Sequence, residues 1–346
     1  MGMNIKFFYV GHGAMNYLQI FDEWGDVVSH FLVDAGSSDD KTDGTVLENN
    51  LALVRTEISN HSTAPLVILI THFHDDHYNL LNSLQIPDSS EYWLCVGSLT
   101  DEWDILNEPQ NPLAMFWNLH PNMNKEILGR LEVPTPFQAP NVPLGDVEVY
   151  YLWNNYFTDI TDDAIQKVFP HVSRGSFYRN RNGAAVAFLC KKRAVVFTGD
   201  MTGANFRALL LEDNLRTAIQ QLFGGHTVWM TVPHHGSIHT LSEPLQHPLI
   251  SLDLSTLYYC TERLQTALTK VFPCAHRLYI SAGVRDRYNH PNYTAAIAYD
   301  RCGLQGSGSY NAFEVYKGLG TIPEPDDVCF EPEDENREAW TCSSDR

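Results

Sequence analysis

Short apolar segments separated by polar and turn-forming residues dominate the first 80 residues. Four of them follow in quick succession, each bounded by Gly, Asp or Asn: NIKFFYV at 4–10, YLQIF at 17–21, HFLVDAG at 30–36 and LVILITH at 66–72. Such runs between turn signals are typical of β-strands. The pattern predicts a strand-dense N-terminal half in which the fourth segment is a buried strand.

This regular pattern is lost between Leu81 and about Val168. The stretch is rich in Pro, Asn and Trp, as in NEPQNPLAMFWNLHPNMN, and contains one clearer strand, DVEVYYLW at 146–153. Clusters of turn-forming residues indicate loops rather than packed elements. We therefore predict an insertion or lid at about 81–168.

Regular elements return after residue 183. AAVAFLC at 184–190 and AVVFTGD at 194–200 predict a hairpin that turns at Lys191 and Lys192. A helix is predicted at 206–223, where apolar residues share one face: Leu211, Leu215, Ala218 and Leu222. Further strands are predicted at 227–233 and 277–283, with a helix at 255–272 between them. Two strand-rich halves with helices predict an α+β fold, a β-sandwich covered on its outer faces.

Composition is that of a globular protein. The chain has 346 residues, of which 44% are apolar, enough for a substantial core. Its seven cysteines include no C-x-x-C pair, which favours free thiols in a reducing compartment over a disulfide framework. Neither end carries an apolar stretch long enough for a membrane span or a signal peptide. We expect a cytoplasmic protein with no membrane partner.

The formal net charge is −19, and part of it lies in the segment EPDDVCFEPEDENREAW near the C-terminus. We predict one domain over 1–318, including the insertion, and an acidic, Pro-containing tail over 319–346 that is mobile or loosely packed. The remainder is still acidic, so a broad electrostatic grip on a nucleic-acid backbone is not supported. An anionic substrate would have to be held locally.

The densest chemistry follows the apolar run PLVILI. His72, His74, Asp76 and His77 occupy an H-x-H-x-D-H pattern within six positions. A loop at the end of a strand can turn these side chains toward one point. Imidazole nitrogen and carboxylate oxygen suit Zn²⁺, or Mn²⁺ where oxygen ligands dominate. A solvated histidine-rich loop is the alternative, and Asp75, between the ligands, is expected to be exposed or to support a ligand.

These residues resemble the pattern of the metallo-β-lactamase-fold hydrolases, in which H-x-H-x-D-H is followed by an Asp ending a later strand and by a His after another. This chain has THFHDDH, then VVFTGD ending at Asp200, then VPHHGS with His234 and His235. It is similar, more closely, to the soluble domain of ComEC-type competence proteins, through YVGHGAMNYLQI, FLVDAG at Asp34, HHGS and ISAGVRDRYNHPN. The resemblance covers roughly residues 4–80 and 180–303 and implies a four-layer αββα sandwich.

The resemblance also implies two divalent metal ions, Zn²⁺ or Mn²⁺, with a hydroxide between them. The implied ligands are His72 and His74 for one ion, Asp76, His77 and one of His234 or His235 for the other, and Asp200 as the bridge. The catalytic residues would be Asp76, Asp200 and His235. Two ions about 3.5–4 Å apart activate water and clamp the oxygens of an in-line displacement.

One part of the family pattern is missing. Where β-lactamases have a third histidine for the first ion, the segment SFYRNRNGAAVAF has Tyr178, Asn180 and Asn182. His171 and His120 are the nearest alternatives, and both lie outside the aligned stretch. The gap predicts a first site richer in oxygen or water ligands, where Mn²⁺ would serve at least as well as Zn²⁺.

Two positions near the N-terminus carry weaker signals. Ala14 stands where ComEC-type domains commonly place an Asp, so the resemblance assigns it no role. His12 lies between two glycines, and GHG alone is a weak motif. We interpret His12 as structural rather than as a metal ligand.

Candidate substrate contacts lie in the segment VRDRYNHP and after the histidine pair. Arg285, Arg287, Tyr288 and His290 fall within six residues, and guanidinium forks suit phosphate oxygens. They could instead cap a strand and solvate a loop. Ser237 could bind substrate or cap a turn.

Three functions from different classes fit these residues. The first is a metal-dependent phosphodiesterase or nuclease acting on a nucleic acid or nucleotide. The second is a lactamase- or thioesterase-like hydrolase of a small neutral or acyl substrate, with the aromatic middle region as an apolar pocket. The third is a weakly active metal-binding module that binds a protein partner through the acidic tail or the insertion.

Overall fold

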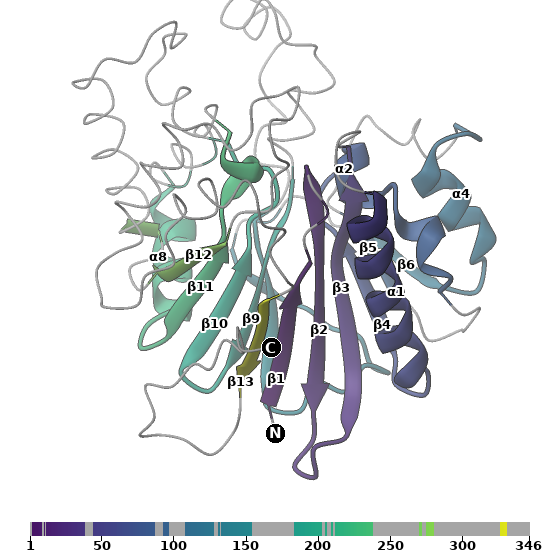
Figure 1. Cartoon of the computed structure of the whole chain (residues 1–346). Helices are drawn as coiled ribbons and strands as arrows, with labels where there is room; N and C mark the ends of the chain where they lie inside the picture. The colour runs from purple at the N-terminus through teal and green to yellow at the C-terminus, as the bar shows by residue number, and fades with distance from the viewer. Residues whose placement is uncertain are drawn as a thin grey trace, which may run out of the picture.

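The computed structural model consists of two mixed β-sheets with helices outside them (Figure 1). It describes residues 2–86 except 9, 11 and 39–43; 93–96; 108–153 except 128–130 and 132; 183–237 except 203–204, 206–208 and 210–211; 270–271; 275–279; and 326–330. The α+β class expected from the sequence is confirmed.

The first sheet contains seven strands among the described residues, in the order β13-β1-β2-β3-β4-β5-β6. Strands β3, β4, β5 and β6 run parallel to one another, whereas β13, β1, β2 and β3 pair antiparallel. The bounds are Gly2–Phe7 for β1, Gly13–Phe21 for β2, Val27–Ser37 for β3, Leu66–Ile70 for β4, Trp93–Val96 for β5, Asn124–Ile127 for β6 and Asp326–Phe330 for β13.

The second sheet has the order β12-β11-β10-β9-β8-β7, six strands in the described part of the chain. The predicted hairpin at Lys191 and Lys192 is confirmed as the antiparallel pair β9 and β10, and β10, β11 and β12 run parallel. The bounds are Thr135–Pro136 for β7, Val147–Trp153 for β8, Ala185–Cys190 for β9, Arg193–Phe197 for β10, Thr227–Thr231 for β11 and Ala275–Tyr279 for β12.

The main core lies between the two sheets. Alternate residues of β3, such as Phe31 and Val33, point into it and meet Phe188 and Phe197 of the second sheet. Leu32, between them, belongs to a second buried cluster with residues of α1 (Gly44–Asn60), which covers the outer face of the first sheet. All five residues of β4 are buried because both faces of that strand are covered, which explains its continuous apolar sequence.

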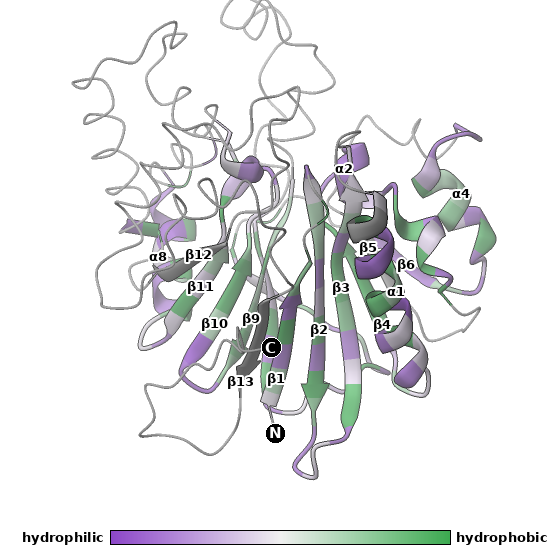
Figure 2. Ribbon diagram, in the orientation of Figure 1, coloured by the Kyte–Doolittle hydropathy of each residue, from purple (hydrophilic) through white to green (hydrophobic). Residues whose placement is uncertain are grey.

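Helix α8, Asp213–Leu222, precedes β11 and lies beside β11 and β12 in Figure 1. Its buried residues are Leu215 and Ile219, whereas Leu222 is half-buried, so the buried face differs from the predicted one by one position. Figure 2 shows apolar residues along strands of both sheets and hydrophilic residues on α8. None of the helices in the described ranges is long and apolar enough to cross a bilayer.

The described part of residues 81–168, the segment predicted as an insertion or lid, contains strands of both sheets. It supplies β5 and β6 to the first sheet and β7 and β8 to the second, together with the 3₁₀ helix η1 (Leu81–Leu84) and helix α4 (Pro112–Leu119). Asn111 caps α4 by accepting hydrogen bonds from two backbone amides. The two-to-four-residue strands β5, β6 and β7 lack the length that makes a strand recognisable in a sequence.

The predicted tail also contributes to the fold. Its segment Asp326–Phe330 is strand β13, which pairs antiparallel with β1 at the edge of the first sheet. This strand lies beyond residue 318, within the segment predicted as a tail. The physical reason is that backbone hydrogen bonds to a sheet edge do not require an apolar sequence.

Candidate metal centre

The histidine-rich motif follows the C-terminal end of β4, an interior strand of the first sheet. The chain turns at Thr71 and enters helix α2, Asp75–Tyr78, a single turn drawn at the upper end of β3 in Figure 1. His72, Asp76 and His77 are buried. The carboxyl ends of β3, β4, β10 and β11 meet at this end of the fold, where parallel strands of open sheets commonly place their functional loops.

Asp200, which follows β10, is the centre of the cluster. Its Oδ2 atom lies 3.5 Å from Nε2 of His72, 3.9 Å from Nδ1 of His74 and 3.5 Å from Nε2 of His234. We call these three histidines the outer group, because the side chains of His74 and His234 are 17% and 14% exposed.

The other oxygen of Asp200 faces a second, fully buried set. Its Oδ1 atom lies 3.1 Å from Nε2 of His77 and 3.3 Å from Nε2 of His235. The same nitrogen of His235 is 3.3 Å from Oδ2 of Asp76. We call Asp76, His77 and His235 the inner group, so one carboxylate directs one oxygen to each group.

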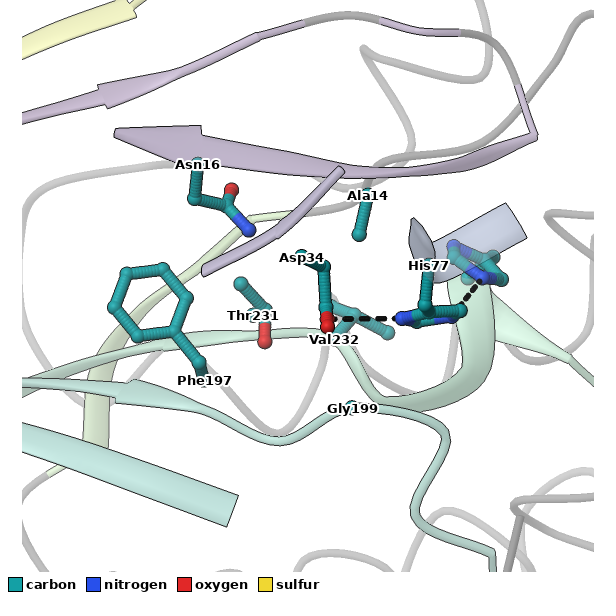
Figure 3. Close-up of a pocket in the computed structure, with 9 residues that line it drawn as sticks. Ala14, Asn16, Asp34, His77, Phe197, Gly199, Thr231 and Val232 are labelled. Carbon is teal, nitrogen blue, oxygen red and sulfur yellow. Dashed lines mark hydrogen bonds and ion pairs between the residues drawn. The ribbon is translucent and has the colours of Figure 1, made fainter. Parts of the chain in front are cut away.

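Asp34, at the end of β3, fixes the orientation of His77. Its Oδ2 lies 2.8 Å from Nδ1 of His77, a contact drawn as a dashed line in Figure 3. The same carboxylate accepts hydrogen bonds from the backbone N–H and the hydroxyl of Thr71, at 2.7 and 2.9 Å. An Nδ1–H donated to Asp34 leaves Nε2 of His77 without a proton and directed at Asp200, which is the tautomer that binds metal.

Close backbone packing holds α2 against β3. A Cβ atom at Gly36 would lie 2.3 Å from the carbonyl carbon of Asp76 and 2.4 Å from the amide nitrogen of His77. Only glycine permits this approach, so the DAG sequence near the end of β3 serves the site through its last residue as well as through Asp34. The pocket beside this contact is lined by Ala14, Asn16 and Phe197 among others, so Ala14 lies next to the site (Figure 3).

The two buried carboxylates of the site are held ionised. Burial alone would raise the pKa of Asp76, but hydrogen bonds from His12 and His235 hold that pKa well below its ordinary value. Burial acts in the same direction on Asp200, where the positive charge of His234, His235 and His77 outweighs it and lowers the pKa. Two anions inside the protein therefore require cationic neighbours.

The buried histidines of the site differ in the direction of their pKa shifts. Burial would lower the pKa of His77, but the carboxylates of Asp34 and Asp200 raise it well above its ordinary value. The pKa of His235 is raised in the same way by Asp200 and Asp76. His72 differs, because burial and the neighbouring His77 lower its pKa to about 4. Without a metal ion, His77 and His235 thus favour their protonated forms, and a bound metal ion would supply that positive charge instead.

The contacts between nitrogens fit a bound cation. Nε2 of His77 lies 3.2 Å from Nε2 of His235, and Nε2 of His72 lies 3.2 Å from Nδ1 of His74. Two nitrogens that bind one tetrahedral Zn²⁺, each about 2.0–2.1 Å from the ion, lie roughly 3.4 Å apart. Oδ1 of the buried Asp200 faces Nε2 of His77 at 3.1 Å and Nε2 of His235 at 3.3 Å, the place where a cation would sit. Three sets of described residues have ligand atoms within 4.8 Å of one another and fit a divalent metal ion: His72, His74 and Asp200; His77, Asp200 and His235; and His12, Asp76 and His235.

One further histidine, for which the sequence pattern is weak, lies in the cluster. Nε2 of His12 is 3.2 Å from Oδ2 of Asp76, and its ring lies 4.6 Å from that of His235. The ligand atoms of these three residues all lie within 4.8 Å of one another. The available signal was its position, because His12 follows β1 and directly precedes β2.

Other predicted site residues lie outside the cluster or outside the described residues. Asp75 is exposed and accepts a hydrogen bond from Tyr78 at 2.6 Å. Ser237 is buried at the end of the 3₁₀ helix η2, Pro233–Gly236, and its N–H donates to the carbonyl of His234. His120 ends α4 and packs on Phe116. The remaining candidates, Arg285, Arg287, Tyr288, His290, His171, Tyr178, Asn180 and Asn182, lie outside the described residues.

Comparisons with known proteins give similarity of structure only. No protein-family model matches the chain, and no curated protein matches its sequence. A mutant of the CmlA β-hydroxylase shares 13% identity at a TM-score of 0.43, with 94% of this chain and 54% of that chain covered, so this chain spans about half its length. Unliganded yeast PDE1 shares 11% at 0.44, covering 88% and 95%. The metallo-β-lactamase FIM-1 from Pseudomonas aeruginosa, in a mono-zinc form, shares 13% at 0.29, covering 66% and 81%.

Proposed function

We propose that the chain is a metal-dependent hydrolase that cleaves phosphodiester bonds. The observation that carries the proposal is the carboxylate of Asp200, whose two oxygens face two separate groups of ligand-type side chains. A carboxylate placed in this way suits a pair of ions rather than a single ion. Yeast PDE1 and ComEC-type domains are the likenesses in favour of phosphodiesters, and neither identifies a substrate.

The ligand set divides between the two groups. His72, His74 and Oδ2 of Asp200 would hold one ion, and the inner group with Oδ1 of Asp200 would hold the other. Two divalent ions in such a site activate water at neutral pH and stabilise the attacking and leaving oxygens of an in-line displacement. Zn²⁺ suits both nitrogen-containing groups, and Mn²⁺ is the alternative.

The chain's own residues orient this chemistry. Asp34 fixes the tautomer of His77, while His12 and His235 both hold the carboxylate of Asp76. Because His74 is partly exposed and the inner group is buried, substrate would approach from the outer group. The net charge of −19 opposes a polyanion, so local cations such as Arg285 would be needed to hold a phosphate.

The proposal is tested by comparing substrates on the metal-loaded protein. Hydrolysis of bis-p-nitrophenyl phosphate is expected, with little turnover of nitrocefin or a thioester. Asp200→Asn and Asp76→Ala are each expected to lower bound metal, measured by elemental analysis, and to abolish hydrolysis. Asp213→Asn is the matched control, because Asp213 lies on α8 with its side chain 80% exposed.

Each of the other functions has its own outcome. Turnover of the thioester or nitrocefin without the phosphodiester would favour an acyl hydrolase. Full metal content with no turnover of any substrate would favour a metal-binding module. Wild-type metal content and rates in both Asp200→Asn and Asp76→Ala would contradict the site itself.

A further inference from the structure

The two adjacent histidines of HHGS point at different oxygens of one carboxylate. Nε2 of His234 lies 3.5 Å from Oδ2 of Asp200, the oxygen that also faces His72 and His74. Nε2 of His235 lies 3.3 Å from Oδ1 of Asp200 instead. The His234 and His235 rings are 6.5 Å apart and inclined by 73°, so they do not converge on one point.

We infer that, on metal binding, His234 joins His72, His74 and Asp200, whose ligand atoms lie within 4.8 Å of one another, as the third nitrogen ligand of the outer metal ion, while His235 serves the inner one. This assignment rests on the proposed function, because it requires that both groups bind metal. It replaces the expectation that only one histidine of the pair is a ligand. It also fills the position for which the segment around Tyr178, Asn180 and Asn182 offers no histidine.

Backbone contacts explain how neighbouring residues serve two ions. The N–H of His234 donates to the carbonyl of Gly199 at 3.1 Å, which ties the start of η2 to the residue before Asp200. The strand ends behind them are joined as well, because the hydroxyl of Thr198 donates to the carbonyl of Thr231 at 3.0 Å. The loops that carry the bridging carboxylate and the histidine pair are therefore held in register.

The backbone at the pair turns sharply. His234 and His235 both adopt the left-handed conformation, with φ of 50° at each, which side chains with a Cβ rarely adopt. The turn directs the imidazole of His235 inward, where it is buried, and leaves the imidazole of His234 at the more open outer group. Two consecutive non-glycine residues in this unfavourable conformation are typical of a functional site, where the direction of the side chains matters.

The assignment changes the chemistry expected of the outer ion. With His72, His74 and His234, its protein ligands are three nitrogens and one carboxylate oxygen, rather than a set rich in oxygen. Imidazole favours Zn²⁺ over Mn²⁺. The assignment therefore favours Zn²⁺ at the outer position, and the expectation that Mn²⁺ serves at least as well applies there only if His234 is not a ligand.

The test counts ions and reports their ligands without an activity assay. Full-length wild-type protein, His234→Ala and His235→Ala are loaded with Zn²⁺, and stoichiometry and affinity are measured by elemental analysis and calorimetry. Wild type is expected to bind two ions. His234→Ala is expected to weaken the binding of one ion more than about 100-fold. Loss of a residue that only supports a metal ligand already lowers metal affinity about 10–100-fold. In that variant the remaining ion should be abolished by adding Asp76→Ala and retained on adding His72→Ala.

Matched variants separate this assignment from folding and from a rival ligand. His234→Asn keeps a residue that tolerates left-handed backbone, so it should show the same loss if His234→Ala does not fold. His61→Ala, at the far end of β4, and His171→Ala should both keep two ions. Cobalt-loaded His234→Ala should lose part of the absorption that four-coordinate cobalt gives.

The outcomes distinguish this inference from the proposed function. A wild-type protein that binds no divalent ion would defeat the proposed function and this inference with it. Two ions of unchanged affinity in both His234→Ala and His234→Asn would overturn only the assignment of His234. Loss of the outer ion in His171→Ala, with both ions kept in His234→Asn, would identify His171 as the ligand.

Discussion

Replacing Asp34 by Asn tests whether this carboxylate holds His77 in its metal-binding tautomer. The substitution keeps the size of the side chain and suits the left-handed backbone at this position, where φ is 59°. Its oxygen must still accept the backbone N–H of Thr71, which lies 2.7 Å from Oδ1 of Asp34. The new amide NH₂ then faces Nδ1 of His77.

Two donors cannot share that contact, so one of two costs follows. Either His77 moves its proton to Nε2, which removes the lone pair directed at the inner ion, or the NH₂ group and Nδ1–H stay buried against each other. A hydrogen bond to a charged group is worth about 1.5–3 kcal/mol. At about 1.4 kcal/mol for each factor of ten, we expect the inner ion to bind roughly 10- to 150-fold more weakly in Asp34→Asn.

The measurement is calorimetric titration of metal into metal-free protein, with competition by a chelator where binding is tight. Thr71→Val is the matched control, because it removes a neutral hydroxyl contact to Asp34 at 2.9 Å and leaves the carboxylate in place. It should cost less than about tenfold, since a neutral hydrogen bond contributes about 0.5–1.5 kcal/mol. Unchanged affinity in Asp34→Asn, or an equal loss in Thr71→Val, would refute the tautomer argument.

Three further predictions concern packing and pH. Gly36→Ala should destabilise the protein by about 1–3 kcal/mol and lower its metal content, because the alanine Cβ would meet the backbone of α2. Thermal unfolding checks this, with Gly44→Ala as the control because a Cβ there would have no atom within 4 Å. Metal affinity of the inner group should rise with pH near neutrality, because the raised pKa of His77 means that binding displaces a proton; titrations in buffers of different ionisation enthalpy count the protons. Burial lowers the pKa of His30 to about 4, so on acidification the unfolded chain binds a proton at His30 before the folded protein does. The free energy of unfolding should therefore fall by up to about 3 kcal/mol as pH drops from 6.5 to 4. Denaturant unfolding of wild type and His30→Gln measures this, and an equal pH dependence in both would exclude His30 as the cause.

Strands with strong local patterns were predictable from the sequence. The four N-terminal strands and the β9–β10 hairpin were predictable because short, largely apolar segments end at turn-forming residues. The histidine motif at 72–77 was found for the same reason, since its spacing is local and it follows a buried strand. Asp200 and His235 required the family resemblance, because nothing local to them predicts that their loops meet.

The missed elements depend on partners distant in the sequence. Strands β5 and β6 contain four residues each, and they are strands because β4 offers an edge for parallel pairing. β13 is similar, since its backbone pairs with β1 across more than 300 residues of chain. The contact of His12 with Asp76 arises only when the strand ends meet, so no local pattern predicts it. Tertiary pairing, rather than local propensity, decides these positions.

The stability of the metal-free site and its function oppose each other. Asp34, His234 and His235 each hold a left-handed backbone, which is unfavourable for residues with a Cβ, and Asp76 and Asp200 are buried anions. Protons on the inner histidines compensate these charges only below their pKa, so this compensation is lost as pH rises. A divalent cation supplies the same compensation without a proton. The buried anions that destabilise the site without a metal ion are therefore the same features that favour a bound cation.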